Sequence, residues 1–308
     1  MINSLPKIKI YEMFMRDGLQ SLNKVYNLET KIKFMELLSD CNFHCVEFGS
    51  TTSPKLLPQM ANSYELFSSI KPKPNSNTKY TMLVPSYSQT QKVLDFNINS
   101  FGLVCSISDT FAQKNIKKTS RESVENVFDQ INLITEKCPN PHIRVYLSCA
   151  FGSPWEDFNT EYLKQLELYI GEFIEYGKQK KLSTDNFDIV ISDTVGLSTM
   201  DKTSEILKML WLSVEQENTK YLGMHIHSKD DKFLDLVVKC IQHNITKFDS
   251  SIGGIGGCPF AEDKAFGNIS TTKLINYLSL YMGYCDYSEV ERIKEVEKEI
   301  MNLINNEK

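Results

Sequence analysis

Short apolar runs alternate with longer segments of helical periodicity along almost the whole chain. The runs are rich in β-branched and aromatic residues, and the longer segments repeat apolar residues every three or four positions. We expect strands at 8–14, 45–49, 80–84, 101–107, 143–149, 187–192, 221–226 and 247–252. The clearest helical segments span 31–38, 120–135, 161–176 and 233–242. Strands that alternate with helices indicate parallel pairing within one sheet.

Eight such units within 308 residues predict an α/β fold, a (β/α)8 TIM barrel with extra C-terminal helices. The alternative is a doubly wound open sheet, but the Gly-rich dinucleotide fingerprint of many such sheets does not follow the first predicted strand. Residues 287–306 predict one or two additional helices. We therefore expect a catalytic barrel domain over residues 1–283 and a helical extension packed on it over residues 284–308.

The composition is that of an ordinary globular protein, with 41% hydrophobic and 24% charged residues. The net charge is −5 and no block of basic residues stands out, so we expect no nucleic-acid partner. No apolar segment reaches the length that spans a bilayer, so we expect no membrane association. The eight cysteines are scattered and the first residues lack a signal-peptide pattern, which together predict a reducing, cytoplasmic location.

Unusual polar residues fall at the carboxyl ends of the predicted strands, where barrel enzymes carry their active sites. In chain order these residues are Arg16 and Asp17, Glu47, Asp193 and Thr194, His225 and His227, and Cys258. Each placement has an ordinary structural reading, but their joint placement at one end of a barrel predicts a catalytic centre.

The His225-Ile226-His227 pair is the strongest sign of a metal site. Residues two apart on a strand point to the same face, so both imidazoles can bind one ion. Asp17 adds a carboxylate and Asn268 an amide oxygen, a set that suits Mg²⁺ or Mn²⁺ and is compatible with Zn²⁺. The competing readings are hydrogen-bonded core histidines, a turn or N-cap role for Asp17, and an N-cap role for Asn268.

A cysteine lies within a glycine-rich run, from Gly253 to Pro259, directly after the last predicted strand. Glycines allow positive φ and close approach to a ligand, so Cys258 is well placed to meet a substrate. Arg16 can face a thioester or carboxylate oxygen, or form a strand-end salt bridge with Glu47. Asp193 and Thr194 can position substrate, or begin a loop.

These residues together resemble the 3-hydroxy-3-methylglutaryl-CoA lyase family of the DRE-TIM metallolyases. The resemblance runs from about residue 10 to residue 278, and the Gly-Gly-Cys-Pro loop is specific to the lyase branch. The matching stretches are Arg16-Asp17-Gly18-Leu19-Gln20, Val46-Glu47-Phe48-Gly49-Ser50, Ser53-Pro54-Lys55, Pro58-Gln59-Met60, Ser192-Asp193-Thr194-Val195-Gly196, His225-Ile226-His227 and residues 249–268.

The resemblance implies a role for each matching residue. Metal ligands would be Asp17, His225, His227 and Asn268; catalytic residues would be Arg16, Glu47, His225 and Cys258, the last on a mobile loop; substrate contacts would be Arg16, Gln20, Ser50, Asp193 and Thr194. The implied reaction splits 3-hydroxy-3-methylglutaryl-CoA into acetoacetate and acetyl-CoA, a step of leucine and ketone-body metabolism. The implied partners are a divalent metal, an acyl-CoA and a second copy of the chain in a homodimer.

The chain departs from the family pattern after His227, where Ser228-Lys229-Asp230-Asp231 replaces Asp-Thr-Tyr-Gly. Ser228 and Asp231 have the spacing of a capping box, which would keep a helix start at this position. Two alternatives stay open. The chain acts on another 3-hydroxyacyl-CoA or a 2-oxo acid, or it binds an acyl-CoA without turning it over.

Overall fold

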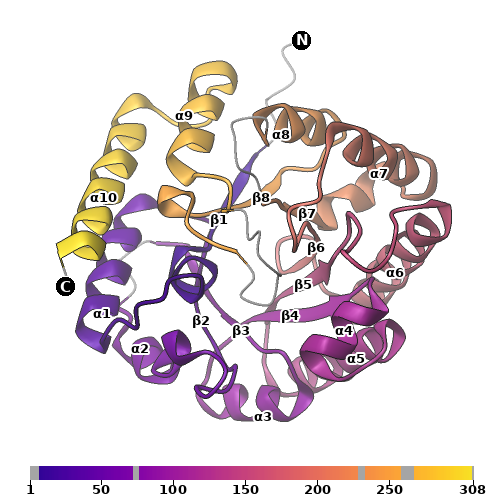
Figure 1. Ribbon diagram of the computed structural model, residues 1–308, viewed down its shortest axis with the longest axis horizontal. Helices are drawn as coiled ribbons and strands as arrows, with labels where there is room; N and C mark the ends of the chain where they lie inside the picture. Colours follow the sequence, from indigo (N-terminus) through magenta and orange to yellow (C-terminus); the bar gives the residue numbers. More distant parts are fainter. Residues whose placement is uncertain (1–6, 72–75, 228–232, 258–266, 307–308) are drawn as a thin grey trace.

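The strands of the computed structural model form a closed parallel barrel in the order β1 to β8 (Figure 1). The structure describes residues 7–71, 76–227, 233–257 and 267–306. Closure is made by β1 and β8, which pair from Lys9↔Lys247 to Glu12↔Ser250. This pairing confirms the TIM barrel and excludes the open sheet. The strands are β1 (Lys9–Glu12), β2 (Cys45–Ser50), β3 (Lys79–Leu83), β4 (Ser100–Ser106), β5 (His142–Ser148), β6 (Phe187–Ser192), β7 (Leu222–His225) and β8 (Lys247–Ser250).

The helices surround the barrel as an outer layer (Figure 1). Within the described residues they are α1 (Leu28–Leu38), α2 (Ser63–Ser69), α3 (Tyr87–Asp95), α4 (Asp109–Ile116), α5 (Ser120–Lys137), α6 (Thr160–Gln179), α7 (Met200–Ser213), α8 (Phe233–Gln242), α9 (Thr271–Met282) and α10 (Tyr287–Asn306). Most of them begin at a side chain that accepts a hydrogen bond from a free amide of the first turn. These caps are Asn27, Ser108, Thr119, Asn159, Thr199 and Ser270.

The strands separate an apolar outer face from a polar barrel interior. In β5, Ile143, Val145 and Leu147 belong to the large apolar core, whereas Arg144 and Tyr146 contact residues of non-adjacent strands. Successive residues of a strand point to opposite faces, so the alternation in the sequence sends these two groups to different sides. The apolar core therefore lies between barrel and helices, and the barrel interior holds polar side chains.

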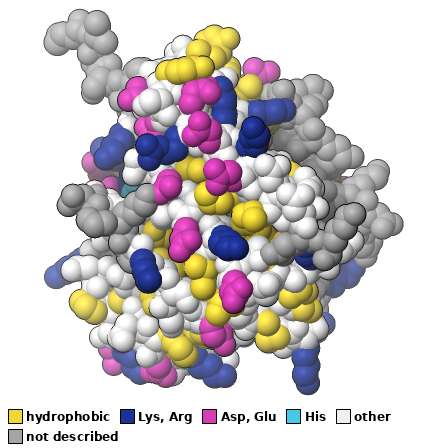
Figure 2. Space-filling model, turned by 90° about the vertical axis from the view of Figure 1, so that its left-hand side faces the viewer, with side chains coloured by type: hydrophobic (Ala, Val, Ile, Leu, Met, Phe, Trp, Pro, Cys, Tyr) yellow, Lys and Arg dark blue, Asp and Glu magenta, His cyan; other side chains and the backbone are white. Residues whose placement is uncertain are grey.

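The C-terminal segment forms one continuous helix, α10, which packs against α9 and α1. Its buried side is apolar and includes Val290, Ile293, Val296 and Ile300. On the side of the molecule where α1 and α10 lie, acidic and basic side chains are interspersed (Figure 2). The domain boundary at residue 283 stays a prediction. No helix in the described part of the chain is both long enough and apolar enough to cross a membrane.

Candidate metal centre and active site

Three of the predicted metal ligands converge at the carboxyl ends of the strands. Asp17 lies in a short helical turn (Phe14–Gly18) after β1, His225 ends β7, and His227 follows it; all three are buried. One ligand atom from each lies within 4.8 Å of the other two, and the two imidazole Nε2 atoms are 3.1 Å apart. Adjacent ligands of an octahedral ion with bonds of about 2.1 Å are separated by about 3.0 Å, so this spacing fits a metal.

The electrostatics of Asp17 and His227 favour the protonation states that metal binding needs, whereas those of His225 oppose it. Burial opposes ionisation of Asp17, but Arg16 and the two histidines outweigh it and hold its pKa well below the usual range. Burial and the neighbouring His225 lower the pKa of His227 to about 4, which keeps this imidazole neutral. For His225, burial lowers the pKa but Asp249 outweighs it, so the net shift is upward.

Arg16 connects the triad to the second catalytic candidate, Glu47 of β2. Its Nη1 lies 2.5 Å from Asp17 Oδ1, and its Nη2 lies 2.6 Å from Glu47 Oε2. Glu47 is fully buried, and its Oε1 has no hydrogen-bond partner among the described residues. Burial raises the pKa of Glu47, although Arg16 opposes the shift. The strand-end salt bridge therefore forms inside the site.

Asn268 lies beside the triad and does not cap a helix. Its Nδ2 donates to Asp17 Oδ2 over 2.7 Å, and its backbone pairs with His227, whereas Ser270 caps α9. A side chain at Gly256 would collide with the Asn268 amide and would lie 2.8 Å from Asp17 Oδ2. Glycine is therefore required at position 256 for these two side chains to meet.

The described part of the glycine run lies beside the metal triad. Gly253, Gly254 and Gly257 have φ values of 66°, 65° and 131°, in the region that favours glycine. The amide of Gly257 lies 3.3 Å from Asp17 Oδ2. Cys258 itself and residues 228–231 lie outside the described residues.

The predicted substrate contacts fall in two groups. Gln20 and Thr194 line the cavity at the carboxyl ends of the strands, and Gln20 Nε2 donates to Asp17 Oδ1 over 2.8 Å. Asp193 instead accepts from the amides of Leu197 and Ser198 at 2.6 and 3.0 Å, so its carboxylate holds the loop after β6. The hydroxyl of Ser50 lies 2.9 Å from that of Thr52.

A cavity of about 390 Å³ opens over Asp17, His225 and His227. Its lining includes hydroxyl groups from β5 and β6 as well as apolar side chains. Lining residues that the sequence did not single out include Thr52, Leu57, Leu83, Val104, Phe111, Lys118, Tyr146 and Ser148. The arrangement can accommodate an acyl group between the triad and an apolar surface.

Tyr146 and Asp249 are functional candidates that sequence reasoning missed. Tyr146 Oη lies 3.4 Å from Glu47 Oε2, and Asp249 Oδ2 lies 3.1 Å from His225 Nδ1. Tyr146 alternates with the apolar Val145 and Leu147 in β5, and Asp249 follows the apolar Phe248 in β8, which indicates an inward side chain at each position. That signal gives the direction of the side chain but does not identify its contacts.

The fold and this site define a barrel enzyme with a candidate divalent-metal centre at the carboxyl ends of its strands. The family model described as HMGL-like matches residues 7–297, so the chain belongs to the HMGL-like family. Membership in this family makes the chain a carbon–carbon lyase.

Similar proteins cover nearly the whole chain. The 3-hydroxy-3-isohexenylglutaryl-CoA/hydroxy-methylglutaryl-CoA lyase of Pseudomonas aeruginosa is 27% identical over 92% of this chain and 89% of its own length. The mitochondrial hydroxymethylglutaryl-CoA lyase of Homo sapiens is 29% identical over 99% of this chain and 88% of its own. The crystal structure of the HMG-CoA lyase from Brucella melitensis superimposes with a TM-score of 0.83 at 26% identity, covering 98% of this chain and 100% of that one.

Proposed function

We propose that this lyase cleaves 3-hydroxy-3-methylglutaryl-CoA into acetoacetate and acetyl-CoA. The observation that carries the proposal is the convergence of Asp17, His225 and His227 on one cavity, beside Arg16, which pairs with the buried Glu47. The names of the similar lyases from Pseudomonas aeruginosa and Homo sapiens support the choice of substrate.

Asp17, His225, His227 and the amide oxygen of Asn268 would hold the divalent ion, with Mg²⁺ or Mn²⁺ preferred for a mixed oxygen and nitrogen set. Once bound, the ion supplies Lewis-acid polarisation of the substrate's tertiary hydroxyl and a neighbouring carboxylate oxygen. Gln20 and Arg16 both contact Asp17 Oδ1, which leaves Oδ2 toward Asn268.

The chain's own residues carry the bond cleavage. A base takes the proton of the tertiary hydroxyl, the carbon–carbon bond breaks, and its electron pair moves to the thioester enolate. Arg16 stabilises the enolate oxygen, because two carboxylates that surround it raise its already high pKa and keep it cationic despite burial. Glu47 fixes the orientation of Arg16 through the Nε and Nη2 contacts.

Two residues exchange protons with the substrate in this proposal. Cys258 protonates the enolate carbon of acetyl-CoA. The sequence predicts His225 as the second carrier, and it accepts the hydroxyl proton only while its Nε2 is not bound to the ion, because its Nδ1 faces Asp249. The amide of Gly257, next to Cys258 in the chain, contacts Asp17, which supports a place for this part of the chain in the site. A Cys258→Ser variant that retains the wild-type rate would remove the cysteine from this assignment.

A substrate with a longer alkyl branch is the second candidate. The apolar residues Leu57, Leu83, Val104 and Phe111 line the cavity, and one relative is named for an isohexenyl substrate as well as for the methyl one. The same cleavage would apply, since the branch lies outside the bond that breaks.

A substrate panel tests the proposal. The chain, loaded with Mn²⁺ and kept reduced, is incubated with 3-hydroxy-3-methylglutaryl-CoA, its isohexenyl analogue, 3-hydroxyglutaryl-CoA and a 4-hydroxy-2-oxo acid, and products are identified by mass spectrometry. We expect acetyl-CoA and acetoacetate from the first substrate. Cleavage of the isohexenyl compound alone would favour the second candidate, and cleavage of none of the four would favour a binding protein.

We also propose a location and an assembly. Buried thiols such as Cys45, Cys105 and Cys240 suit a reducing compartment, and we propose the cytoplasm. Cell fractionation tests this location. The homodimer stays a prediction, which light scattering of the purified chain would test.

A further inference from the structure

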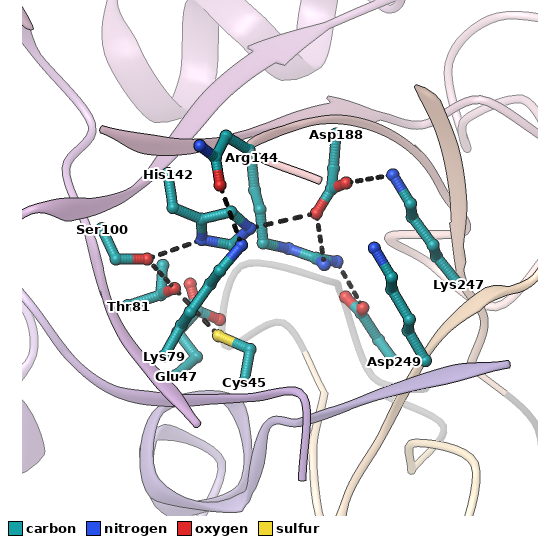
Figure 3. A network of polar contacts seen from close by, with 12 residues as sticks. Cys45, Glu47, Lys79, Thr81, Ser100, His142, Arg144, Asp188, Lys247 and Asp249 are labelled. Carbon is teal, nitrogen blue, oxygen red and sulfur yellow. Dashed lines mark hydrogen bonds and ion pairs between the residues drawn. The ribbon is translucent and has the colours of Figure 1, made fainter. Parts of the chain in front are cut away.

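A chain of buried charged side chains crosses the barrel interior beneath the metal triad. Arg144 of β5 lies between Asp188 of β6 and Asp249 of β8 (Figure 3). Its Nη1 is 3.1 Å from Asp188 Oδ2, and its Nη2 is 2.5 Å from Asp249 Oδ1. Because β5 and β8 are not neighbours in the barrel, the second contact passes through the interior.

Arg144 is completely buried yet electrically balanced. Its guanidinium carbon lies 3.5 Å from the centre of the Tyr11 ring, and Lys247 forms a second ion pair with Asp188 at 2.5 Å. Two cations thus face two carboxylates. Buried ion pairs rarely stabilise a fold more than well-packed apolar residues do, so a role other than stability deserves a test.

The other oxygen of Asp249 is directed to the metal centre. Asp249 Oδ2 lies 3.1 Å from His225 Nδ1, while His225 Nε2 faces His227. A carboxylate that holds one ring nitrogen of a ligating histidine fixes the ring's tautomer and direction. Asp249 therefore contacts Arg144 with one oxygen and a candidate metal ligand with the other.

We propose that Arg144 is a positioning residue for the metal centre: it holds Asp249 in the orientation that accepts from His225 Nδ1 and aims Nε2 at the ion. The inference rests on the proposed function, since it assumes that His225 is a ligand. Without Arg144, the Asp249 carboxylate loses a charged partner and can rotate away from His225. The expected consequence is a weaker metal site in a barrel that still folds.

Lys247 provides the matched control. Lys247 is the first residue of β8 and lies away from His225. Its Nζ donates to Asp188 Oδ1 and to the Thr184 carbonyl oxygen. Lys247→Met therefore removes a buried cation from the same network and from the same carboxylate that Arg144 contacts. It leaves the Arg144–Asp249–His225 contacts in place.

The test measures Mn²⁺ binding and thermal stability of the full chain as wild type, Arg144→Met, Arg144→Lys and Lys247→Met. Changes to groups that orient a metal ligand typically weaken metal binding by about 10- to 100-fold, and we expect this of Arg144→Met. The Mn²⁺ affinity of Arg144→Lys should lie between those of wild type and Arg144→Met, because an ammonium group reaches one carboxylate where guanidinium reaches two. Lys247→Met should lower the melting temperature but leave the Mn²⁺ dissociation constant within about twofold of wild type.

A second measurement separates this inference from the proposed function. Nitrogen-15 NMR of histidine-labelled, metal-free protein at pH 8 reports which ring nitrogen of His225 carries the proton, with the signal assigned through a His225→Gln variant. Wild type should show the proton on Nδ1, and Arg144→Met should show a mixture. This measurement needs no metal, so it tests whether Arg144 orients His225 through Asp249 even if wild type fails to bind Mn²⁺. An intact Arg144 effect on His225 without Mn²⁺ binding would contradict the proposed metal centre alone.

Three results would overturn the inference. The first is a folded Arg144→Met variant with wild-type Mn²⁺ affinity and an unchanged His225 signal. The second is an equal loss of affinity in Lys247→Met, which would indicate general loosening of the barrel. The third applies if Arg144→Met does not fold, because Arg144→Lys is then the variant that tests the inference. Wild-type Mn²⁺ affinity with an unchanged His225 signal in Arg144→Lys would overturn it.

Discussion

The two ends of the barrel both bury charged side chains, but they use them differently. At the carboxyl ends of the strands, Asp17, His225 and His227 converge on one point and line a cavity of about 390 Å³. At the amino ends, Lys247 donates to the Thr184 carbonyl oxygen over 2.7 Å and to Asp188 Oδ1. Both acceptors belong to the barrel itself. The first end presents ligand atoms to a cavity, whereas the charged groups of Lys247 and Asp188 at the second end are paired with one another.

This comparison shows that a shifted pKa alone does not identify a site. Burial lowers the pKa of His142 at the amino end to about 4, and burial lowers that of His227 at the carboxyl end to about 4 as well. His142 lies between Ser100 and Asp188, whereas His227 faces a second imidazole beside a cavity. Converging ligand atoms next to open space distinguish the two.

Removing a carboxylate from the triad has the largest expected effect. Asp17→Asn deletes the negative charge that two histidines and Arg16 surround, so we expect metal-dependent turnover below detection and retention of the barrel by circular dichroism. The exposed Asp201→Asn in α7 is the matched control and should retain wild-type turnover. Turnover of the Asp17→Asn variant at the wild-type rate would remove Asp17 from the metal site.

Neutralising Arg16 should have the next largest effect. Arg16→Gln removes the cation that stabilises the enolate, and kcat should fall about 100- to 1,000-fold, the usual loss for one such donor. Mn²⁺ affinity should change far less than kcat. Arg121→Gln, which breaks only exposed ion pairs with Glu125 and Glu172, should leave kcat unchanged. A fall in Mn²⁺ affinity that accounts for the whole loss of kcat would assign Arg16 to metal binding instead.

At the amino end we expect a loss of stability without a loss of chemistry. Lys247→Met leaves Asp188 with a missing partner in a fully buried position, and removing one member of a buried pair costs about 3 to 5 kcal/mol. Urea unfolding measures this cost, and kcat with saturating metal should stay within about twofold of wild type. A large fall in kcat in the folded variant would break the distinction between the two ends.

Glu12 lies at the carboxyl end of β1, but its carboxylate is hydrogen-bonded to other residues of the chain and is not directed into the cavity. It accepts from the amides of Phe14 and Ile252 and from the Thr271 hydroxyl, and burial raises its pKa from 4.5 to about 7. The folded state then holds a proton that the unfolded state has lost, so the free energy of unfolding falls as the pH rises from about 4.5 to about 7, by up to about 3 kcal/mol. Glu12→Gln should remove this slope in urea titrations. An unchanged slope would assign the pH dependence to other groups.

The fold could be predicted because it depends on local patterns. Eight apolar runs separated by helical periodicity fixed the number and order of the strands, and the additional helix of residues 287–306 was visible in the same way. Closure through β1 and β8 joins residues more than 230 positions apart and followed only from the count of strands.

The site could be predicted in part. The position of Asp17, His225 and His227 follows from the rule that barrel sites lie at the carboxyl ends of strands. The role of Arg144 could not be predicted, because its partner Asp249 is 105 residues away and the intervening strands decide whether they meet. The Asp193 carboxylate showed the reverse case, a polar residue at a strand end that holds a loop.

The most direct test of the account measures acetyl-CoA release from 3-hydroxy-3-methylglutaryl-CoA by wild type and His227→Ala, each with Mn²⁺ and then with excess chelator. The account predicts release by metal-loaded wild type, loss of release with chelator and restoration when Mn²⁺ is returned in excess. It predicts no release by His227→Ala under any condition. Release that survives the chelator, or a folded His227→Ala variant with wild-type turnover, would contradict the claim that this triad holds the metal of the reaction.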